Sequence, residues 1–165
     1  MNTKRTIAIA ATFSLLILSC LSGCRRDQTE WFYASLADVK NAKPSAQSWI
    51  PDDILPSTSH NIHAAGELSP SREWCAFEFS PSDSETSLKT ISKADTLPEE
   101  VGNVPNPRKD WWPSILIGDL NVEQIRKAGL QLFVSEKPAN AVNTTIYLFA
   151  LNSQKGRGYF FSTYK

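Results

Sequence analysis

The sequence predicts an α+β fold in which an antiparallel sheet of about five strands carries two or three helices on one face. Three observations predict this class. The last third of the chain contains three segments rich in β-branched and aromatic residues, at 130–136, 144–152 and 158–164. Residues 73–80 alternate between apolar and polar side chains, as in a strand with one buried face. Other segments carry helix-capping residues followed by apolar residues at helical spacing.

A first helix is expected at the start of the folded region. Thr29 is a residue type that caps helices. The apolar residues Trp31, Leu36 and Val39 follow it at spacings that a helix brings to one side. A proline lies shortly downstream, so the helix should end by Asn41.

An ordered loop is expected at 43–59, which is rich in Pro, Ser and Asp. The loop should pack on the sheet, because it carries apolar area to bury. That area belongs to Trp49, Ile50, Ile54 and Leu55.

Two strands should follow this loop, at 61–68 and 73–80, joined by a turn with the sequence SPSR. In the second strand Cys75, Phe77 and Phe79 occupy alternate positions and therefore share one face.

The middle of the chain predicts a helix and an irregular segment. Ser82 and Glu85 have the spacing of a capping box, which predicts a helix over 82–93. Three prolines in 96–112 predict irregular backbone there.

The C-terminal part predicts a further helix and three strands. Asn121 should cap a helix with the sequence VEQIRKA, and Gly129 should end it. Residues 153–157 should form the hairpin loop between the last two strands. The centres of the strands carry few polar residues, so both faces of this part of the sheet are expected to be covered.

The composition is typical of one globular domain. Of the 165 residues, 41% are hydrophobic and 21% are charged, and basic and acidic residues balance at 17 each. Without a run of basic residues the chain has no field to attract phosphate backbones, so no nucleic-acid partner is expected.

The N-terminal residues have the layout of a secretory signal peptide. Lys4 and Arg5 form a basic region, and residues 6–21 carry no charge. This apolar segment is short for a membrane-spanning helix, which needs about 20 residues. The expected division is a leader at 1–23, a tether at 24–28 and a single α+β domain at 29–165.

The residues Leu21-Ser22-Gly23-Cys24 resemble the lipobox of bacterial lipoproteins. This resemblance implies that the thiol of Cys24 carries a diacylglycerol and that the leader is removed just before it. Fatty acyl chains such as palmitate would then hold the domain on a membrane, because two or more chains give lasting attachment. By the same resemblance, Arg25 directly after the cysteine implies the outer membrane, with the domain facing the periplasm.

Two other cysteines leave alternatives open. Cys20 competes with Cys24 as the lipidated residue, but Leu18 before it fits the small-residue pattern less well. The other alternative to lipidation at Cys24 is that the N-terminal segment is not cleaved and itself anchors the protein. Cys75 lies in an apolar strand and is expected to be buried and unreactive, against the alternative of an intermolecular disulfide.

Several stretches of the mature chain are similar to a family of small uncharacterised bacterial proteins, many with lipoprotein leaders. These stretches are SWIPDDILPSTSHNI, REWCAFEF, DWWPSIL and the C-terminal aromatic strand. The family has no assigned reaction or catalytic residues, so the resemblance implies a single domain and leaves its function open.

No catalytic or metal-binding pattern is present in the sequence. His60 and His63 are the only histidines, and their spacing predicts rings on opposite faces of a strand. A metal or a general base would need carboxylates to converge on one of them. The sequence contains no GxSxG, SxxK or phosphate-binding glycine loop. We therefore expect no catalytic residue, no cofactor and no metal.

The tryptophans offer a binding hypothesis. Trp49, Trp111 and Trp112 lie beside prolines or apolar residues in loops, where their rings could stack on a sugar or a peptide. The simpler interpretation is that these rings pack irregular loops onto the sheet.

Together these observations favour a non-enzymatic, lipid-anchored protein that binds a periplasmic envelope component, either a protein or peptidoglycan. One alternative is an immunity or inhibitor lipoprotein that blocks a toxin or hydrolase reaching the periplasm. Another is an envelope hydrolase that uses His60 or His63 with a nearby carboxylate.

Overall fold

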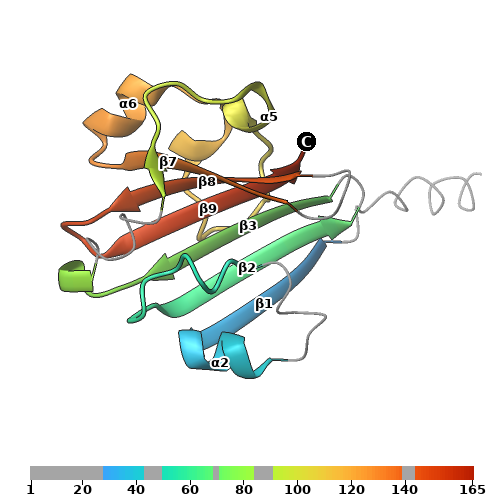
Figure 1. Ribbon diagram of the computed structural model, residues 1–165, viewed down its shortest axis with the longest axis vertical. Helices are drawn as coiled ribbons and strands as arrows, with labels where there is room; N and C mark the ends of the chain where they lie inside the picture. The colour runs from blue at the N-terminus through green and yellow to red at the C-terminus, as the bar shows by residue number, and fades with distance from the viewer. Residues whose placement is uncertain (1–27, 43–49, 69–70, 84–90, 139–143) are drawn as a thin grey trace, which may run out of the picture.

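The computed structural model describes residues 28–42, 50–68, 71–83, 91–138 and 144–165. Most of them form one antiparallel sheet of seven strands, in the order β1-β2-β3-β9-β8-β7-β4 (Figure 1). The strands are β1 (Gln28–Ser35), β2 (His60–Leu68), β3 (Ser71–Glu78), β4 (Ser92–Lys93), β7 (Gln131–Pro138), β8 (Thr144–Asn152) and β9 (Arg157–Tyr164).

Shorter elements complete the described part of the chain. A two-stranded antiparallel sheet pairs β5 (Asn103–Val104) with β6 (Gly118–Asp119). The helices are α2 (Leu36–Asn41), α5 (Glu99–Gly102) and α6 (Val122–Lys127), and the 3₁₀ turns are η1 (Pro81–Asp83) and η2 (Ser114–Leu116).

The prediction of about five strands was too low, and the first missed strand is β1. The predicted helix start at Thr29 was wrong, because residues Gln28–Ser35 form a strand that pairs with β2 along its length. Alternate side chains of β1 pack against the core, those of Trp31 and Tyr33 among them. The helix begins after Ser35 and ends at Asn41, where the sequence predicted its end.

The second missed strand is β4. The helix expected over 82–93 was wrong at its end, because Ser92 and Lys93 pair with Val134 and Phe133 at the edge of the sheet. At its start Pro81–Asp83 form a 3₁₀ turn. The middle of the expected helix lies outside the described residues.

The other strands of the seven-stranded sheet and the helix after Asn121 were predicted correctly. The strands β5 and β6 were not predicted, and α5 and β5 lie in the segment 96–112 that was expected to be irregular. The strand pair β2–β3 and the group β7–β8–β9 join into one sheet through the contact of β3 with β9. The side chain of Asn121 accepts a hydrogen bond from the backbone of Gln124, so it caps α6. Gly129 follows the helix with φ of +82°, a conformation that glycine adopts without strain.

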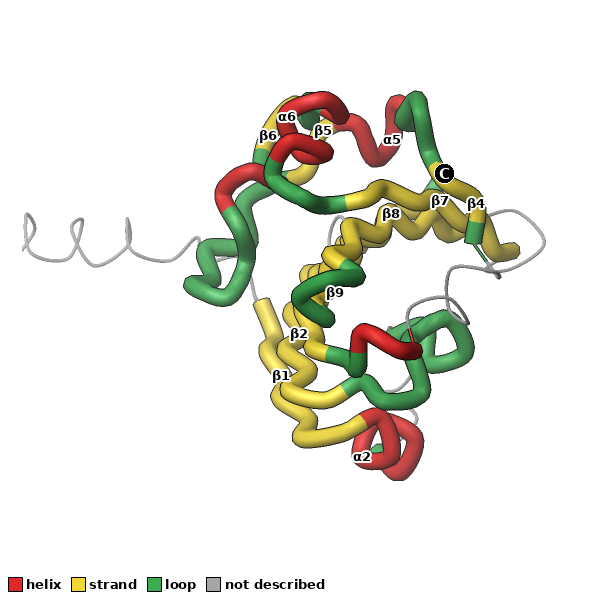
Figure 2. The backbone as a smooth tube through the Cα atoms, turned by 90° about the vertical axis from the view of Figure 1, so that its left-hand side faces the viewer, coloured by secondary structure: helices red, strands yellow, loops and turns green. Residues whose placement is uncertain are grey.

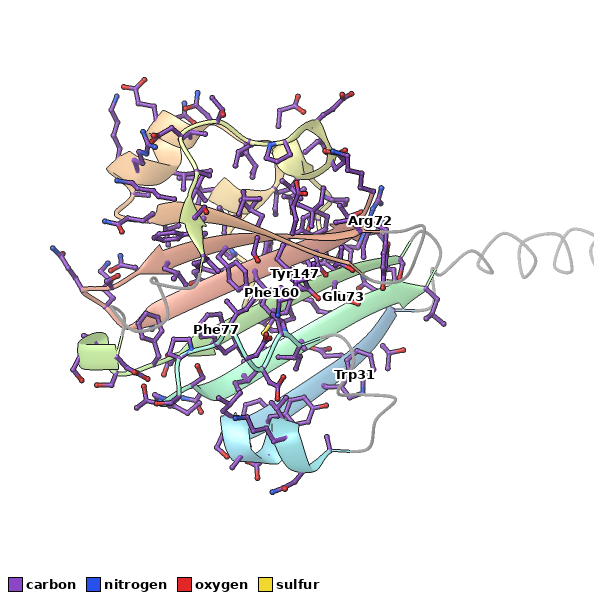
Figure 3. All side chains as sticks on the ribbon, viewed as in Figure 1. Trp31, Arg72, Glu73, Phe77, Tyr147 and Phe160 are labelled. Carbon is purple, nitrogen blue, oxygen red and sulfur yellow. The ribbon has the colours of Figure 1, made fainter. Side chains whose placement is uncertain are left out.

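Helices lie on both sides of the sheet, and not on one as predicted (Figure 2). On one face α2 and the loop at 50–55 cover a core that includes Phe77, Tyr147 and Phe160 (Figure 3). On the other face α5, α6 and η2 cover a second core around Trp74, Leu148 and Phe161. Successive side chains of each central strand point to the two faces in turn. Because both faces are covered, these strands carry few polar residues.

Candidate functional site

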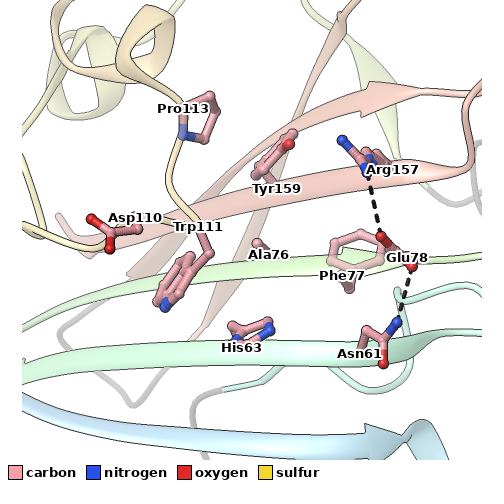
Figure 4. A pocket seen from close by; sticks show the side chains of 10 residues that line it. All are labelled: Asn61, His63, Ala76, Phe77, Glu78, Asp110, Trp111, Pro113, Arg157 and Tyr159. Carbon is pink, nitrogen blue, oxygen red and sulfur yellow. Dashed lines mark hydrogen bonds and ion pairs between the residues drawn. The ribbon is translucent and has the colours of Figure 1, made fainter.

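A groove of about 410 Å³ lies on the face of the sheet that carries the second core (Figure 4). Its floor is formed by β2, β3 and β9, and one wall is the loop before η2. The volume lies within the range of ~300–1,000 Å³ that is typical of small-molecule sites. The lining residues are Asn61, His63, Ala76, Phe77, Glu78, Asp110, Trp111, Pro113, Arg157 and Tyr159.

A β-bulge shapes the floor at the start of β2. His63 pairs with Ala76 and His60 pairs with Glu78. Between these two pairs β2 has two residues and β3 has one, which is the register shift of a β-bulge. Asn61 takes up the extra residue with φ of +48°. The bulge therefore turns both histidines to the same face, and the prediction of opposite faces was wrong.

Glu78 is the centre of a polar group beside this bulge, which we call the Glu78 cluster: Asn61, Glu78, Arg157 and His60. Its carboxylate accepts a hydrogen bond from the Asn61 side-chain amide at 3.0 Å. It also lies 3.6 Å from His60 Nε2 and 3.7 Å from a guanidinium nitrogen of Arg157. The charges of this cluster are thus largely paired with one another (Figure 4).

The wall that contains Trp111 is held to β1 by Glu30. One carboxylate oxygen accepts a hydrogen bond from the Trp111 indole at 2.9 Å, and the other accepts one from the Lys109 ammonium. The hydrogen bond from Lys109 and then that from Trp111 lower the pKa of Glu30, because both favour its charged form. Two segments about eighty residues apart in the chain are joined in this way.

Aromatic rings continue along this wall and onto the sheet. The rings of Phe32 and His63 are 4.9 Å apart, and those of His63 and Trp111 are stacked at 5.9 Å. Phe32 is 58% exposed although its side chain is large and apolar. We call these three residues the aromatic row. His63 and Trp111 are half-buried, so Phe32 supplies the exposed apolar area, which next to a groove is typical of a binding surface.

The three tryptophans proposed from the sequence have different positions. Trp111 lines the groove. Trp112 is 5% exposed and donates to the carbonyl of Leu116 at 3.1 Å, so it packs η2 onto the sheet and contributes no binding surface. Trp49 lies outside the described residues, as do Cys24 and the whole leader.

Most groove residues were not found from the sequence. Asn61, Glu78, Asp110, Arg157 and Tyr159 carry no motif, because they come from four separate segments. One indication was present: Asn61 lies between the only two histidines, and asparagine is a residue type that tolerates left-handed backbone at a bulge.

The chemistry of the groove favours binding over catalysis. It does bring His63 together with the carboxyl groups of Glu78 and Asp110, as a hydrolase would require. The two carboxyl groups, however, lie at opposite ends of the groove (Figure 4). Among the described residues that line it, none is Ser, Thr, Cys or Lys, so no such nucleophile is available. No three His, Cys, Asp or Glu side chains in the described ranges are grouped to hold a metal ion.

Cys75 lies on the opposite face of the sheet and is fully buried with a free thiol, so its predicted burial is confirmed. Burial, and secondly the nearby carboxyl of Glu73, raises the pKa of the thiol well above its usual value. A protonated, buried thiol is a poor nucleophile.

In the described part of the chain, no helix has the length and apolar character needed to cross a bilayer. No protein-family model, no curated protein and no solved structure matches this chain. Both resemblances drawn from its sequence stay predictions.

Proposed function

We propose that this protein is a lipid-anchored binding protein of the bacterial envelope and that the groove beside the Glu78 cluster is its ligand site. The lipobox that ends at Cys24 supports the anchor. The observation that carries the binding function is the groove itself. The paired polar groups of Asn61, Glu78 and Arg157 and the rings of His63 and Trp111 line one volume of about 410 Å³.

The proposed anchor places the domain close to the membrane. Strand β1 begins at Gln28, four residues after Cys24. A chain of four residues spans at most about 14 Å. A ligand of the groove is therefore expected to be a component of the envelope, within reach of a domain that cannot move far from the outer membrane.

Photocrosslinking in intact cells tests this function. A benzophenone side chain is introduced at Ser114, which is exposed and follows Pro113 of the groove wall. The matched control carries it at Glu123, exposed on α6. Irradiation should give an adduct from position 114 and none from position 123, and Trp111→Leu should remove that adduct. The same adducts from both positions, or an adduct that Trp111→Leu leaves unchanged, would contradict the proposal.

Hydrolysis at the same groove is a second candidate function, because His63 shares the groove with two carboxyl groups. Binding is favoured because the carboxylate of Glu78 already accepts from Asn61 and pairs with Arg157. The purified chain should release no soluble fragments from peptidoglycan. Release that His63→Gln abolishes would replace the binding function with an enzymatic one.

A further inference from the structure

We propose that the ligand of the groove is a saccharide, bound through the hydroxyl groups and one apolar face of a pyranose ring. This inference rests on the proposed binding function and gives its chemical class. Three features carry it: the donors and acceptors of the Glu78 cluster, the aromatic row along the wall of the groove, and the position of its floor within the sheet.

The Glu78 cluster suits a neutral ligand that both donates and accepts hydrogen bonds. Glu78 can only accept, whereas Arg157 and the amide nitrogen of Asn61 donate. A sugar hydroxyl does both, so it can bond to a member of each kind at once. An anionic ligand would meet the carboxylates of Glu78 and Asp110, and a cationic ligand would meet Arg157. With two carboxylates and one guanidinium in its lining, the groove selects against an anionic ligand.

The aromatic row supplies the other half of a sugar site. Hydrogen bonding of the Trp111 indole to Glu30 fixes that ring beside His63, so its orientation is set before a ligand arrives. Rings held in this way stack on flat apolar surfaces at a low entropic cost. The C–H face of a pyranose is such a surface. Phe32 extends the row by a further ring, which suits a ligand longer than one sugar unit.

The floor of the groove argues against an extended peptide. Peptides that bind to sheets add a strand to a free edge and use its backbone groups. The strands of the floor, β2, β3 and β9, are all interior: β2 pairs with β1 and β3, and β9 pairs with β3 and β8. None of these three strands therefore offers a free edge for an added strand, and a saccharide needs no such edge.

Calorimetry on the full chain in detergent micelles tests the proposal. One titrant is a β-1,4-linked tetrasaccharide of N-acetylglucosamine, which represents the glycan strands of peptidoglycan. The other is the neutral hexose oligosaccharide of the lipopolysaccharide outer core. Both sources share the pyranose chemistry, and the two titrations distinguish them. Saturable binding of at least one is expected, and cosedimentation with purified sacculi checks the first.

Two substitutions in the groove and two matched controls locate the binding. Trp111→Leu and Arg157→Gln should each weaken binding roughly tenfold, because each removes a stacking or a charged hydrogen-bonding partner. Tyr164→Ser removes another exposed aromatic ring, and Lys127→Gln removes another exposed positive charge; both should leave the affinity unchanged. Circular dichroism confirms that each variant is folded. Arg157 is an exposed side chain, so its variant tests the site even if Trp111→Leu does not fold.

Failure of the saccharide proposal is distinguishable from failure of the binding function. Absence of binding to both oligosaccharides and to sacculi overturns the saccharide, and so does binding that neither groove variant weakens. If the adduct from position 114 persists in cells under either result, the groove still binds an envelope component, but one of a different chemical class.

Discussion

The carboxyl group of Glu73 is buried on the face of the sheet that α2 covers. Strand β3 directs it to the same face as Cys75, where it is buried near Trp31 and Phe160. Its carboxylate accepts a hydrogen bond from the hydroxyl of Ser162 at 2.6 Å. Burial raises the pKa of Glu73 to about 7, and the hydrogen bond from Ser162 opposes this effect only in part.

This raised pKa predicts that stability falls as the pH rises. The unfolded chain releases the proton of Glu73 near pH 4.5 and the folded chain near pH 7, so the folded state binds more protons between these values. The free energy of unfolding should therefore decrease across this window and level off above it. Glu73→Gln removes the titration, so the variant should gain up to about 3 kcal/mol relative to the natural protein between pH 5 and pH 8.

Urea unfolding of both proteins at pH 5 and pH 8 measures that difference. Glutamine keeps an oxygen that can accept from Ser162, so the hydrogen bond itself is conserved in the comparison. An equal effect of the substitution at the two pH values would show that Glu73 does not titrate in this range.

Asn61 has left-handed backbone, which only a few residue types adopt readily. Asn61→Gly and Asn61→Ala both remove the amide that donates to Glu78, but only the alanine has a Cβ that crowds this conformation. The alanine variant should be about 1 kcal/mol less stable than the glycine variant. Their urea midpoints provide the measurement. Equal midpoints would mean that the bulge does not require left-handed backbone in solution.

At the scale of single elements, the loop between β8 and β9 depends on one glycine. Gly156 has φ of +59°, and its carbonyl accepts a hydrogen bond from the backbone of Phe79 at 2.8 Å. A Cβ built on it would lie 2.1 Å from the carbonyl oxygen of Phe79, closer than any two such atoms can approach. The loop between β8 and β9 therefore packs its backbone directly against the end of β3. This contact leaves no room for a side chain at position 156.

Gly156→Ala should lower the free energy of unfolding by at least about 2 kcal/mol, because strain and a steric clash act together. Gly102→Ala is the matched control, since its Cβ would meet nothing within 4 Å and its effect should stay within about 0.5 kcal/mol. Thermal and urea unfolding compare the two. A change at Gly156 as small as that at Gly102 would contradict the contact with Phe79.

The boundary between β1 and α2 shows how one element was mistaken for another. Trp31, Leu36 and Val39 have helical spacing, but Trp31 belongs to the strand and the other two to the helix. The helix begins at a capping box in which Ser35 accepts from the backbone of Asp38 and donates from its own backbone to the Asp38 carboxylate. The pairing of β1 with β2 overrode the helical spacing, because tertiary contacts outweigh weak local preferences.

At the scale of the whole molecule, the proposed lipid anchor makes a prediction of its own. Cys24→Ala should abolish labelling by a radioactive or clickable fatty acid and leave the leader uncut, because lipid transfer needs the thiol of that residue. Gel mobility and mass spectrometry of the mature N-terminus measure both effects. Cys20→Ala serves as the control and should be processed normally. Normal labelling of the Cys24 variant, or a mature chain that begins at another residue, would overturn the anchor.

The burial of both sheet faces was predicted from the central strands alone. Strands β8 and β9 lack the polar alternation of a half-exposed sheet, and each of their faces is indeed covered by a core. The edge strands were missed because β4 has only two residues and β1 lies beside a helix start. Short or mixed segments contain too few residues for a period to be recognised.

The sequence by itself determined the elements whose information is local: three C-terminal strands, the cap at Asn121 and the buried position of Cys75. Only the tertiary structure decided the groove. One extra residue at Asn61 turned His60 and His63 to the same face, and strand pairing brought Glu78 beside Arg157. The physical reason is range: capping and alternation act over a few residues, whereas register and bulges depend on partners far away in the chain.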